Sequence, residues 1–190
     1  MNQVDENNRL SELIHASRVL FAKKGYAHVG MREIASQANC SPMQIYRLGL
    51  NKEDLLAEVS ISLTDEQLKK ITVGLSIRKD EAIDDYIIRY LTLLYESDIE
   101  NIAIRRETAA FGWKWSAKYE ERIIAQVFGL LKPISDALNN LGYDQIEARC
   151  MSIWSLYYVG FRSAVIHQLD AHFCINSITP SLRLLLKYKN

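Results

Sequence analysis

The stretch that decides the fold runs from Ile34 to Tyr46 and reads Ile-Ala-Ser-Gln-Ala-Asn-Cys-Ser-Pro-Met-Gln-Ile-Tyr. It predicts two short helices joined by a tight turn. Asn39 suits the turn, because asparagine tolerates the left-handed backbone conformation. Ser41 followed by Pro42 predicts the start of the second helix, since serine is a favoured N-cap and proline is favoured at the first helical position. This layout is that of a helix-turn-helix.

The second of these helices has the shape and chemistry of a helix that enters a DNA major groove. We expect Pro42, Met43, Gln44 and Arg47 to point outward, while Ile45 and Leu48 can point inward. The chain has 190 residues and no net charge, so no global basic field indicates nucleic acid. Residues 9–52, however, contain seven basic and two acidic side chains, a local excess of five positive charges. That excess is a modest electrostatic footprint for phosphate contacts, although a solvated helix surface would look the same.

Composition places the chain among folded proteins of the cytoplasm. Hydrophobic residues make up 48% of it, enough for a sizeable core. We find neither a signal peptide nor a membrane anchor and expect a cytoplasmic protein without membrane contact. Cys40, Cys150 and Cys174 are odd in number and show no CxxC spacing, which favours a reducing environment and no disulfide framework.

Apolar residues recur at helical spacing along the whole chain, and no strand alternation appears, so we predict an all-α fold. The predicted N-terminal helices are one from about Leu10 to Lys24, the helix-turn-helix pair, and one from Lys52 to about Ile71 that Asn51 caps. Next we predict a helix around Ile83–Leu94, one or two helices between Ile99 and Trp115 with a break at Gly112, and a helix around Ile123–Leu138 that is kinked at Pro133 and stopped by Gly142. The last two predicted helices run from Gln145 to Leu169, capped by Asp144, and from Thr179–Pro180 to Lys187. We predict two domains, residues 1–51 for DNA binding and residues 52–190 for ligand binding and dimerisation.

The predicted helix at 145–169 is apolar on most of its sides, which indicates burial on most sides. One side can face the domain core and another a second subunit. Gly160 and Ala164, four residues apart, would allow close helix approach. The last helix is similarly apolar, so we predict a homodimer through these last two long helices, against the alternative of a plain monomeric core.

Five sequence blocks together resemble the DNA-binding domain of the TetR family of transcriptional regulators. The blocks are Leu20–Tyr26, Met31–Ala35, Ala38–Ser41, Ile45–Tyr46 and Lys52–Leu56. Their order and spacing agree with the family, and they lie within about a quarter of the chain, from Leu10 to Leu56.

The resemblance implies three N-terminal helices for DNA, a connecting fourth helix, and a helical effector-binding domain that dimerises through its last two long helices. It implies a repressor, or less often an activator, of operator DNA whose activity a small molecule alters. It also implies that Tyr46 and Lys52 contact phosphates. Gly49 departs from the family, which usually has an aromatic residue there. Leu48 or Leu50 would have to fill the space, and a looser recognition helix would favour an alternative function, that of a helical ligand-binding or interaction protein with weakened DNA recognition.

The side chains of the predicted recognition helix differ in what they can read. Gln44 can pair bidentately with adenine, and Arg47 with guanine or a phosphate. Met43 suits either a thymine methyl group or the protein surface, and Arg32 suits a phosphate or solvent. Phosphate contacts position a protein without carrying sequence information, so the operator sequence does not follow. The complete predicted DNA-binding set is Arg32, Ser41, Pro42, Met43, Gln44, Tyr46, Arg47 and Lys52.

A helical bundle rich in aromatic residues suits an apolar effector, and we select Phe111, Trp154 and Tyr158 as ligand-binding candidates. His167, Asp170, His172 and Cys174 have spacings of three, two and two, which do not place all four on one helical face. We therefore predict no metal site, and we find no nucleophile elbow, HExxH or glycine-rich phosphate loop. We expect a regulator that is not an enzyme and needs no cofactor.

Overall fold

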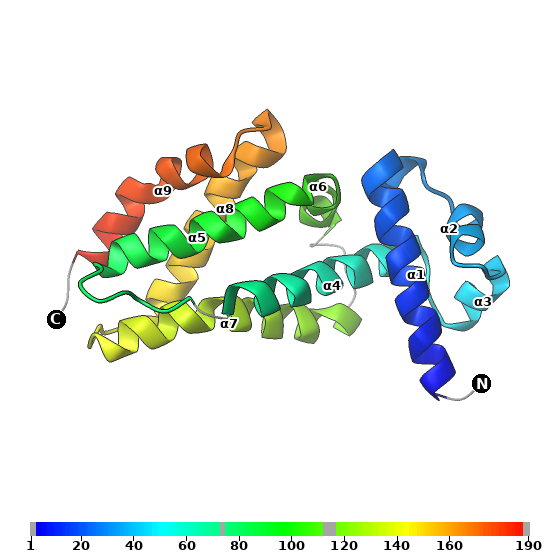
Figure 1. The fold of residues 1–190 in the computed structure, drawn as a ribbon, viewed down its shortest axis with the longest axis horizontal. Coiled ribbons are helices and arrows are strands. Elements are labelled where there is room, and N and C mark those ends of the chain that lie inside the picture. Colours follow the sequence, from blue (N-terminus) through cyan, green and yellow to red (C-terminus); the bar gives the residue numbers. More distant parts are fainter. Residues whose placement is uncertain (1–2, 73–74, 112–116, 188–190) are drawn as a thin grey trace. The chain divides into compact units, whose positions relative to one another are not determined.

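The computed structural model describes residues 3–72, 75–111 and 117–187, and the regular structure in these ranges is helical (Figure 1). The helices are α1 (Gln3–Lys24), the 3-10 turn η1 (Tyr26–His28), α2 (Met31–Gln37), α3 (Pro42–Arg47), α4 (Lys52–Thr72), α5 (Ile83–Glu100), α6 (Ile102–Phe111), α7 (Ala117–Asn140), α8 (Ile146–His167) and α9 (Ala171–Leu186). The predicted all-α class is confirmed for the described residues. The predicted break at Gly112 lies outside them.

The chain forms two compact units, and neither is continuous in sequence. Unit 1 comprises Met1–Asp65 and Ala103–Ile123, and unit 2 comprises Glu66–Ile102 and Ile124–Asn190. Unit 1 therefore contains the predicted DNA-binding residues 1–51, the first part of α4, all of α6 except Ile102, and the first turns of α7. Helices α4 and α7 each contribute residues to both units.

The core of unit 1 collects the inward faces of the three N-terminal helices and of α4. Helix α2 contributes a small apolar face, since Ile34 is fully buried and Ala35 and Ala38 are nearly so. Ile45 of α3 is fully buried in the same core. Burial of one such side chain contributes roughly 1.5–3 kcal/mol, so Ile45 is a major anchor for a helix of only six residues.

The core of unit 2 is built mainly from α5, α7, α8 and α9, and α9 packs against both α5 and α8. Its buried tyrosines keep their hydroxyl groups paired. Tyr90 donates to the carbonyl of Leu130 at 2.7 Å, and Tyr95 donates to the carbonyl of Tyr157 at 2.9 Å. These bonds matter because an unpaired hydroxyl in an apolar interior costs about 1–3 kcal/mol.

Gly160 marks a very close approach within unit 2. A Cβ atom at this position would lie 2.2 Å from Oη of Tyr95 and 2.9 Å from the carbonyl oxygen of Cys174. Ala164, one turn later, is also buried. The pair was predicted to allow close helix approach, and at Gly160 that approach is made to α5 and α9 of the same subunit.

The predicted cap of α8 is wrong. Asp144 does not cap the helix, because the N-cap residue is Gln145, which has a left-handed backbone (φ 47°). The Asp144 carboxylate instead pairs with the Arg149 guanidinium at 2.8 Å. Because Arg149, in the first turn of α8, binds the Asp144 carboxylate, this carboxylate does not cap the backbone of the helix.

The predicted start of the last helix is also wrong. Helix α9 begins at Ala171, where the Asp170 carboxylate accepts a hydrogen bond from the backbone N–H of Phe173 at 2.8 Å. Pro180 lies inside the helix. The Thr179 hydroxyl donates to the carbonyl of Ile175 at 2.8 Å, so it does not act as an N-cap. The Thr-Pro pair resembles a helix start, but an earlier capped helix continues through it.

Candidate nucleic-acid interface

The turn between α2 and α3 has the geometry that the sequence predicts. Asn39 has a left-handed backbone (φ 49°). The N–H of Cys40 donates to the carbonyl of Ala35 at 2.9 Å, and the N–H of Asn39 donates to that of Ser36 at 3.2 Å. These two bonds form a Schellman motif, which satisfies carbonyls at the end of α2 and fixes the direction in which the chain leaves it.

The first turn of α3 is closed by its own side chains. Ser41 is the N-cap and Pro42 occupies the first helical position, as predicted. Oε1 of Gln44 accepts a hydrogen bond from the backbone N–H of Ser41 at 2.8 Å, which is the glutamine half of a capping box. Gln44 therefore has a structural bond in addition to any role at DNA.

Gly49 closes the other end of α3. It has a left-handed backbone (φ 69°), which glycine adopts without steric cost. Its N–H donates to the carbonyl of Tyr46 at 3.0 Å, and the N–H of Leu50 donates to that of Ile45 at 3.4 Å, a second Schellman motif. Leu50, one of the two leucines expected to compensate for the missing aromatic residue, is buried in the same core as Ile45.

The outward face of α3 combines apolar and polar side chains. Met43 is 66% exposed and Tyr46 55% exposed, and Gln44 and Arg47 are exposed beside them. Leu48 is half-buried against the core of unit 1. The helix therefore presents to solvent the side chains that the sequence assigned to DNA.

Helix α1 forms a groove with this face, which the sequence analysis did not predict. A surface groove of about 350 Å³ is lined by Asp5, Asn8, Arg9, Glu12, Gln44 and Arg47. Arg9 donates to the carbonyl of Ala38 at 3.1 Å and pairs with Glu12 at 2.6 Å. No local pattern in the sequence gives this neighbourhood, because it depends on how α1 packs against the later helices.

The remaining predicted DNA-binding residues lie at or near helix starts. Arg32 is exposed in the first turn of α2, and Ser41 is exposed at the start of α3. Lys52 begins α4, and its ammonium lies 4.2 Å from the centre of the Tyr26 ring. Partial burial there lowers the pKa of Lys52 from its usual value. The contact with Tyr26 holds the ammonium near the start of α4.

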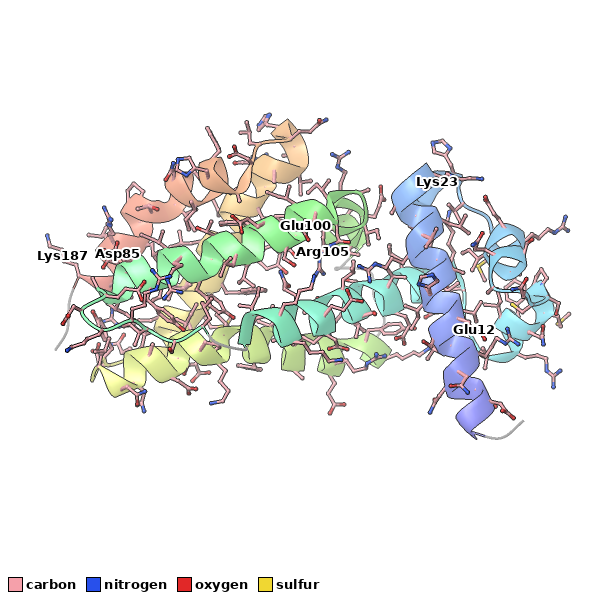
Figure 2. All side chains as sticks on the ribbon, viewed as in Figure 1. Glu12, Lys23, Asp85, Glu100, Arg105 and Lys187 are labelled. Atoms are coloured by element: carbon pink, nitrogen blue, oxygen red, sulfur yellow. The ribbon has the colours of Figure 1, made fainter. Side chains whose placement is uncertain are left out.

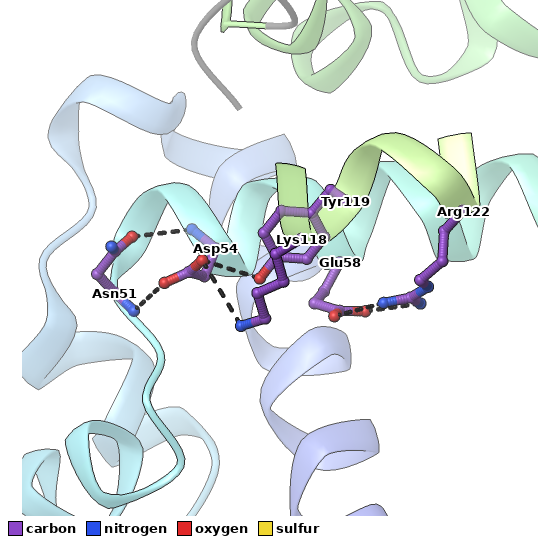
Figure 3. Close-up of polar contacts among 6 residues, drawn as sticks. All are labelled: Asn51, Asp54, Glu58, Lys118, Tyr119 and Arg122. Carbon is purple, nitrogen blue, oxygen red and sulfur yellow. Dashed lines mark hydrogen bonds and ion pairs between the residues drawn. The ribbon is translucent and has the colours of Figure 1, made fainter. Parts of the chain in front are cut away.

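The N-terminal half of α4 carries a cluster of polar contacts with α7 (Figure 3). Asn51 and Asp54 cap α4 reciprocally, at 2.8 and 2.9 Å. Asp54 also accepts a hydrogen bond from the Tyr119 hydroxyl at 2.9 Å. Glu58, one turn on, forms two bonds with the Arg122 guanidinium, at 2.8 and 3.1 Å. We call these five residues the α4–α7 clamp.

Tyr119 and Glu58 are the buried members of the clamp. Burial raises the pKa of Tyr119, and the neighbouring Asp54 carboxylate raises it further, so the phenol stays protonated and donates. The charged Glu58 side chain is compensated by Arg122, since a buried carboxylate without a partner would be strongly destabilising. Arg105 of α6 (labelled in Figure 2) adds a third link to α4, because it donates to the Thr64 hydroxyl at 3.0 Å.

The ligand-binding candidates are only partly brought together. Trp154 stacks on Tyr157, with ring centres 5.2 Å apart, and meets Tyr158 edge-on at 5.2 Å. Tyr158 is more than half exposed, and the side chain of Phe111 is not among those that the structure describes. Tyr157 continues inward to Tyr95, with ring centres 4.5 Å apart. The Tyr95–Tyr157–Trp154 arrangement is named the aromatic stack below.

A buried carboxylate lies beside the aromatic stack. Asp98 of α5 accepts a hydrogen bond from the Tyr157 hydroxyl at 2.6 Å and another from the Gln67 amide at 3.1 Å. Both Asp98 and Gln67 are buried. The sequence analysis did not select either residue, because the pairing joins three helices that are far apart along the chain.

Residues 13–59 match the family model described as bacterial regulatory proteins, tetR family. A search of curated protein sequences finds no match. Among the described residues, no helix is both long and apolar enough to cross a bilayer.

Solved structures share the fold of the whole chain. A TetR transcriptional regulator from Rhodococcus sp. RHA1 is 15% identical, with a TM-score of 0.71, and the match covers 99% of this chain and 100% of that one. A regulatory protein in the tetR family from Rhodococcus RHA1 is 23% identical (TM-score 0.63; 98% and 97% covered). The regulator FadR from Bacillus subtilis, solved with stearoyl-CoA, is 16% identical (TM-score 0.66; 90% and 96% covered).

The matched segment contains the whole helix-turn-helix, with α2, α3 and both Schellman motifs, and extends into α4. The family is one of regulatory proteins, which confirms the expectation of a regulator rather than an enzyme. Residues 13–59 therefore form a DNA-binding domain of the tetR family of bacterial regulatory proteins, and the chain as a whole has the fold of solved TetR-family regulators.

Proposed function

We propose that this regulator is a repressor that binds operator DNA as a homodimer and is released by a small-molecule effector. The observation that carries the proposal is α3, a six-residue helix fixed at both ends with its polar and apolar contact residues facing solvent. A helix this short is not stable by itself in water, so the caps and the buried Ile45 anchor hold its shape. A rigid exposed helix can meet base edges without a large ordering cost on binding.

The proposed DNA contacts divide into two groups. Met43, Gln44 and Arg47 reach base edges from the exposed face of α3. Arg32, Ser41, Tyr46 and Lys52 contact phosphates and set the register, while Pro42 shapes the first turn of the helix. The alternative function, a protein with weakened DNA recognition, was motivated by Gly49. That motivation is reduced because Gly49 completes the motif that ends α3.

The proposed dimer interface is the outward face of α8 and α9. Exposed apolar residues recur along α8 at Met151, at the adjacent pair Tyr158 and Val159, and at Ile166. Intervals of seven to eight residues from Met151 to the pair and from the pair to Ile166 keep them on one side of the helix. Leu184 of α9 is also exposed. Two copies of such a face can bury each other across a two-fold axis and form a four-helix seam.

The proposed effector site lies at the aromatic stack in unit 2. Trp154 is half-buried with its ring stacked on Tyr157, and the Asp98 carboxylate accepts a hydrogen bond from the Tyr157 hydroxyl. Aromatic faces and a carboxylate together suit a planar or cationic organic molecule. Tyr158, a predicted ligand-binding residue, is better assigned to the dimer face, because it is exposed beside Val159. The stearoyl-CoA of the FadR complex suggests an acyl ligand as the alternative chemistry.

We propose that effector binding reaches the DNA-binding helices through α4 and α7. Both helices contribute residues to unit 1 and unit 2, and the α4–α7 clamp joins them within unit 1. An effector that prefers one arrangement of the dimer shifts the population toward it. Repression is lost when that arrangement no longer places the two recognition helices one DNA turn apart.

The homodimer is tested by replacing Val159, which is 62% exposed on α8, with glutamate. We expect Val159→Glu to fold normally but to sediment as a monomer, because the dimer face would bury an unpaired charge. Affinity for a two-fold symmetric operator should fall strongly, because each half-site would be bound independently. The measurement is analytical ultracentrifugation together with a salt-titrated gel shift on the DNA upstream of the protein's own coding sequence.

Val19→Glu is the matched control, since Val19 is 41% exposed on α1 of unit 1 and undergoes the same chemical change. It should remain a dimer. A Val159→Glu protein that sediments as a dimer and binds DNA with wild-type affinity would show that this face is not the interface.

A further inference from the structure

The capping bond at the start of α3 limits what Gln44 can recognise in DNA. The amide of a glutamine has one acceptor oxygen and a donor NH₂ group. A bidentate contact with adenine needs both ends at the same base edge, with the oxygen accepting from N6 and the nitrogen donating to N7. In the structure, the oxygen of Gln44 is turned back to the N–H of Ser41 at 2.8 Å.

The backbone itself sets the orientation of this amide. The N–H of Ser41 is a donor, so it requires the oxygen of Gln44 and excludes the NH₂ group from that side. Pro42 has no N–H, so the donors at this end of the helix are few, and the Ser41 bond satisfies one of them. The oxygen has a second lone pair, but the Ser41 bond turns it toward the helix backbone; to lay both ends of its amide along one base edge, Gln44 would have to rotate and weaken this half of the capping box.

The side chain of Gln44 is accessible at the start of α3, with its amide oxygen bonded to Ser41. Gln44 is an exposed residue, and it lines the same groove as Arg47. It is the third residue of the helix, and the N-terminal residues of a recognition helix are the ones that contact base edges.

We infer that Gln44 reads DNA through its amide NH₂ group alone, and so selects a base edge that presents acceptors. In the major groove, O6 and N7 of guanine and O4 of thymine are such acceptors. Adenine presents its N7 acceptor beside the N6 amino donor, and cytosine presents only the N4 amino donor. This inference rests on the proposed DNA-binding function. It replaces the bidentate adenine contact that glutamine alone would suggest.

The variant that separates the two roles of Gln44 is Gln44→Glu. A glutamate at this position keeps the acceptor oxygen that the capping box needs, but it replaces the NH₂ donor with a second acceptor. Gln44→Ala is the comparison, since it removes both the cap and the donor. The measurements are thermal unfolding of each protein and binding to duplexes that carry every single base-pair change in an operator selected by the wild-type protein.

We expect Gln44→Glu to unfold at the wild-type temperature and Gln44→Ala to unfold earlier. At one base pair of each half-site, the wild-type protein should prefer guanine or thymine, and Gln44→Glu should shift the preference toward cytosine by about tenfold or more. All other positions should keep their preferences.

Two results would overturn the inference. One is a uniform loss of affinity in Gln44→Glu with no change in preferred base. The other is a wild-type preference for adenine that weakens about tenfold when the 6-amino group of adenine is deleted, because only a free glutamine oxygen could read that group. A wild-type protein that selects no DNA sequence would overturn the proposed function, and this inference with it.

Discussion

Replacement of Arg47 by alanine is expected to lower operator affinity by about tenfold or more while leaving the fold intact. Arg47 is exposed on the last turn of α3, so its truncation opens no cavity in the core. One arginine bonded bidentately to guanine is worth about 1–3 kcal/mol of discrimination, and it also supplies a positive charge. The measurement is a DNA titration at several salt concentrations, with circular dichroism to check helicity.

Arg78→Ala is the control for the loss of one positive charge, because Arg78 is an exposed arginine of unit 2. It should bind the operator with nearly wild-type affinity. If the Arg47 and Arg78 variants bind DNA equally well, α3 does not carry recognition in the way proposed.

Gly160→Ala should lower the free energy of unfolding by about 3 kcal/mol, at the upper end of what overpacking usually costs. The new Cβ atom would lie 2.2 Å from Oη of Tyr95 and 2.9 Å from the carbonyl of Cys174, and a backbone carbonyl cannot move aside cheaply. The double variant with Tyr95→Phe should recover only part of the loss, since the contact with Cys174 remains. Chemical denaturation of the three proteins measures both effects.

Gly129→Ala is the matched control, a glycine-to-alanine change in the interior of another helix. A Cβ atom at Gly129 would meet only the flexible side chain of Leu68, at 3.2 Å. Alanine is favoured over glycine in helices by about 1 kcal/mol, so this variant should be neutral or more stable. A Gly160→Ala protein as stable as Gly129→Ala would contradict the close packing of α8.

The helix-turn-helix was predictable because its signals are local. Asn39, Ser41 and Pro42 each act within a few residues, and the structure has each of them in the predicted role. Gly49 shows the limit of comparison by residue type. Glycine suits this position because the backbone there has a positive φ angle, and the next residue, Leu50, is buried in the core of unit 1. Neither feature can be predicted from the absence of an aromatic side chain.

Two helix starts were predicted wrongly because a local capping pattern was present, while a contact with another residue decided the structure. Thr179–Pro180 has the pattern of a helix start, yet Asp170 had already begun α9 nine residues earlier. Asp144 has the chemistry of an N-cap, but Arg149 binds its carboxylate.

The two-unit organisation could not be predicted for a related reason. Residues 103–123 belong to unit 1 together with residues before 66. Contacts such as that between Asp54 and Tyr119 join side chains 65 residues apart, and no periodicity encodes them. The Asp98–Tyr157 pair beside the aromatic stack is hidden from the sequence in the same way.

The central claim is that a dimer of this chain reads DNA through two copies of α3, and selection from a randomised duplex pool tests it most directly. We predict enrichment of an inverted repeat whose half-site centres lie one helical turn, about 10 base pairs, or a multiple of it apart. Affinity for the selected site should fall steeply as salt rises, as phosphate contacts require. Failure to enrich any sequence at low salt, or enrichment of a sequence without two-fold symmetry, would contradict the account.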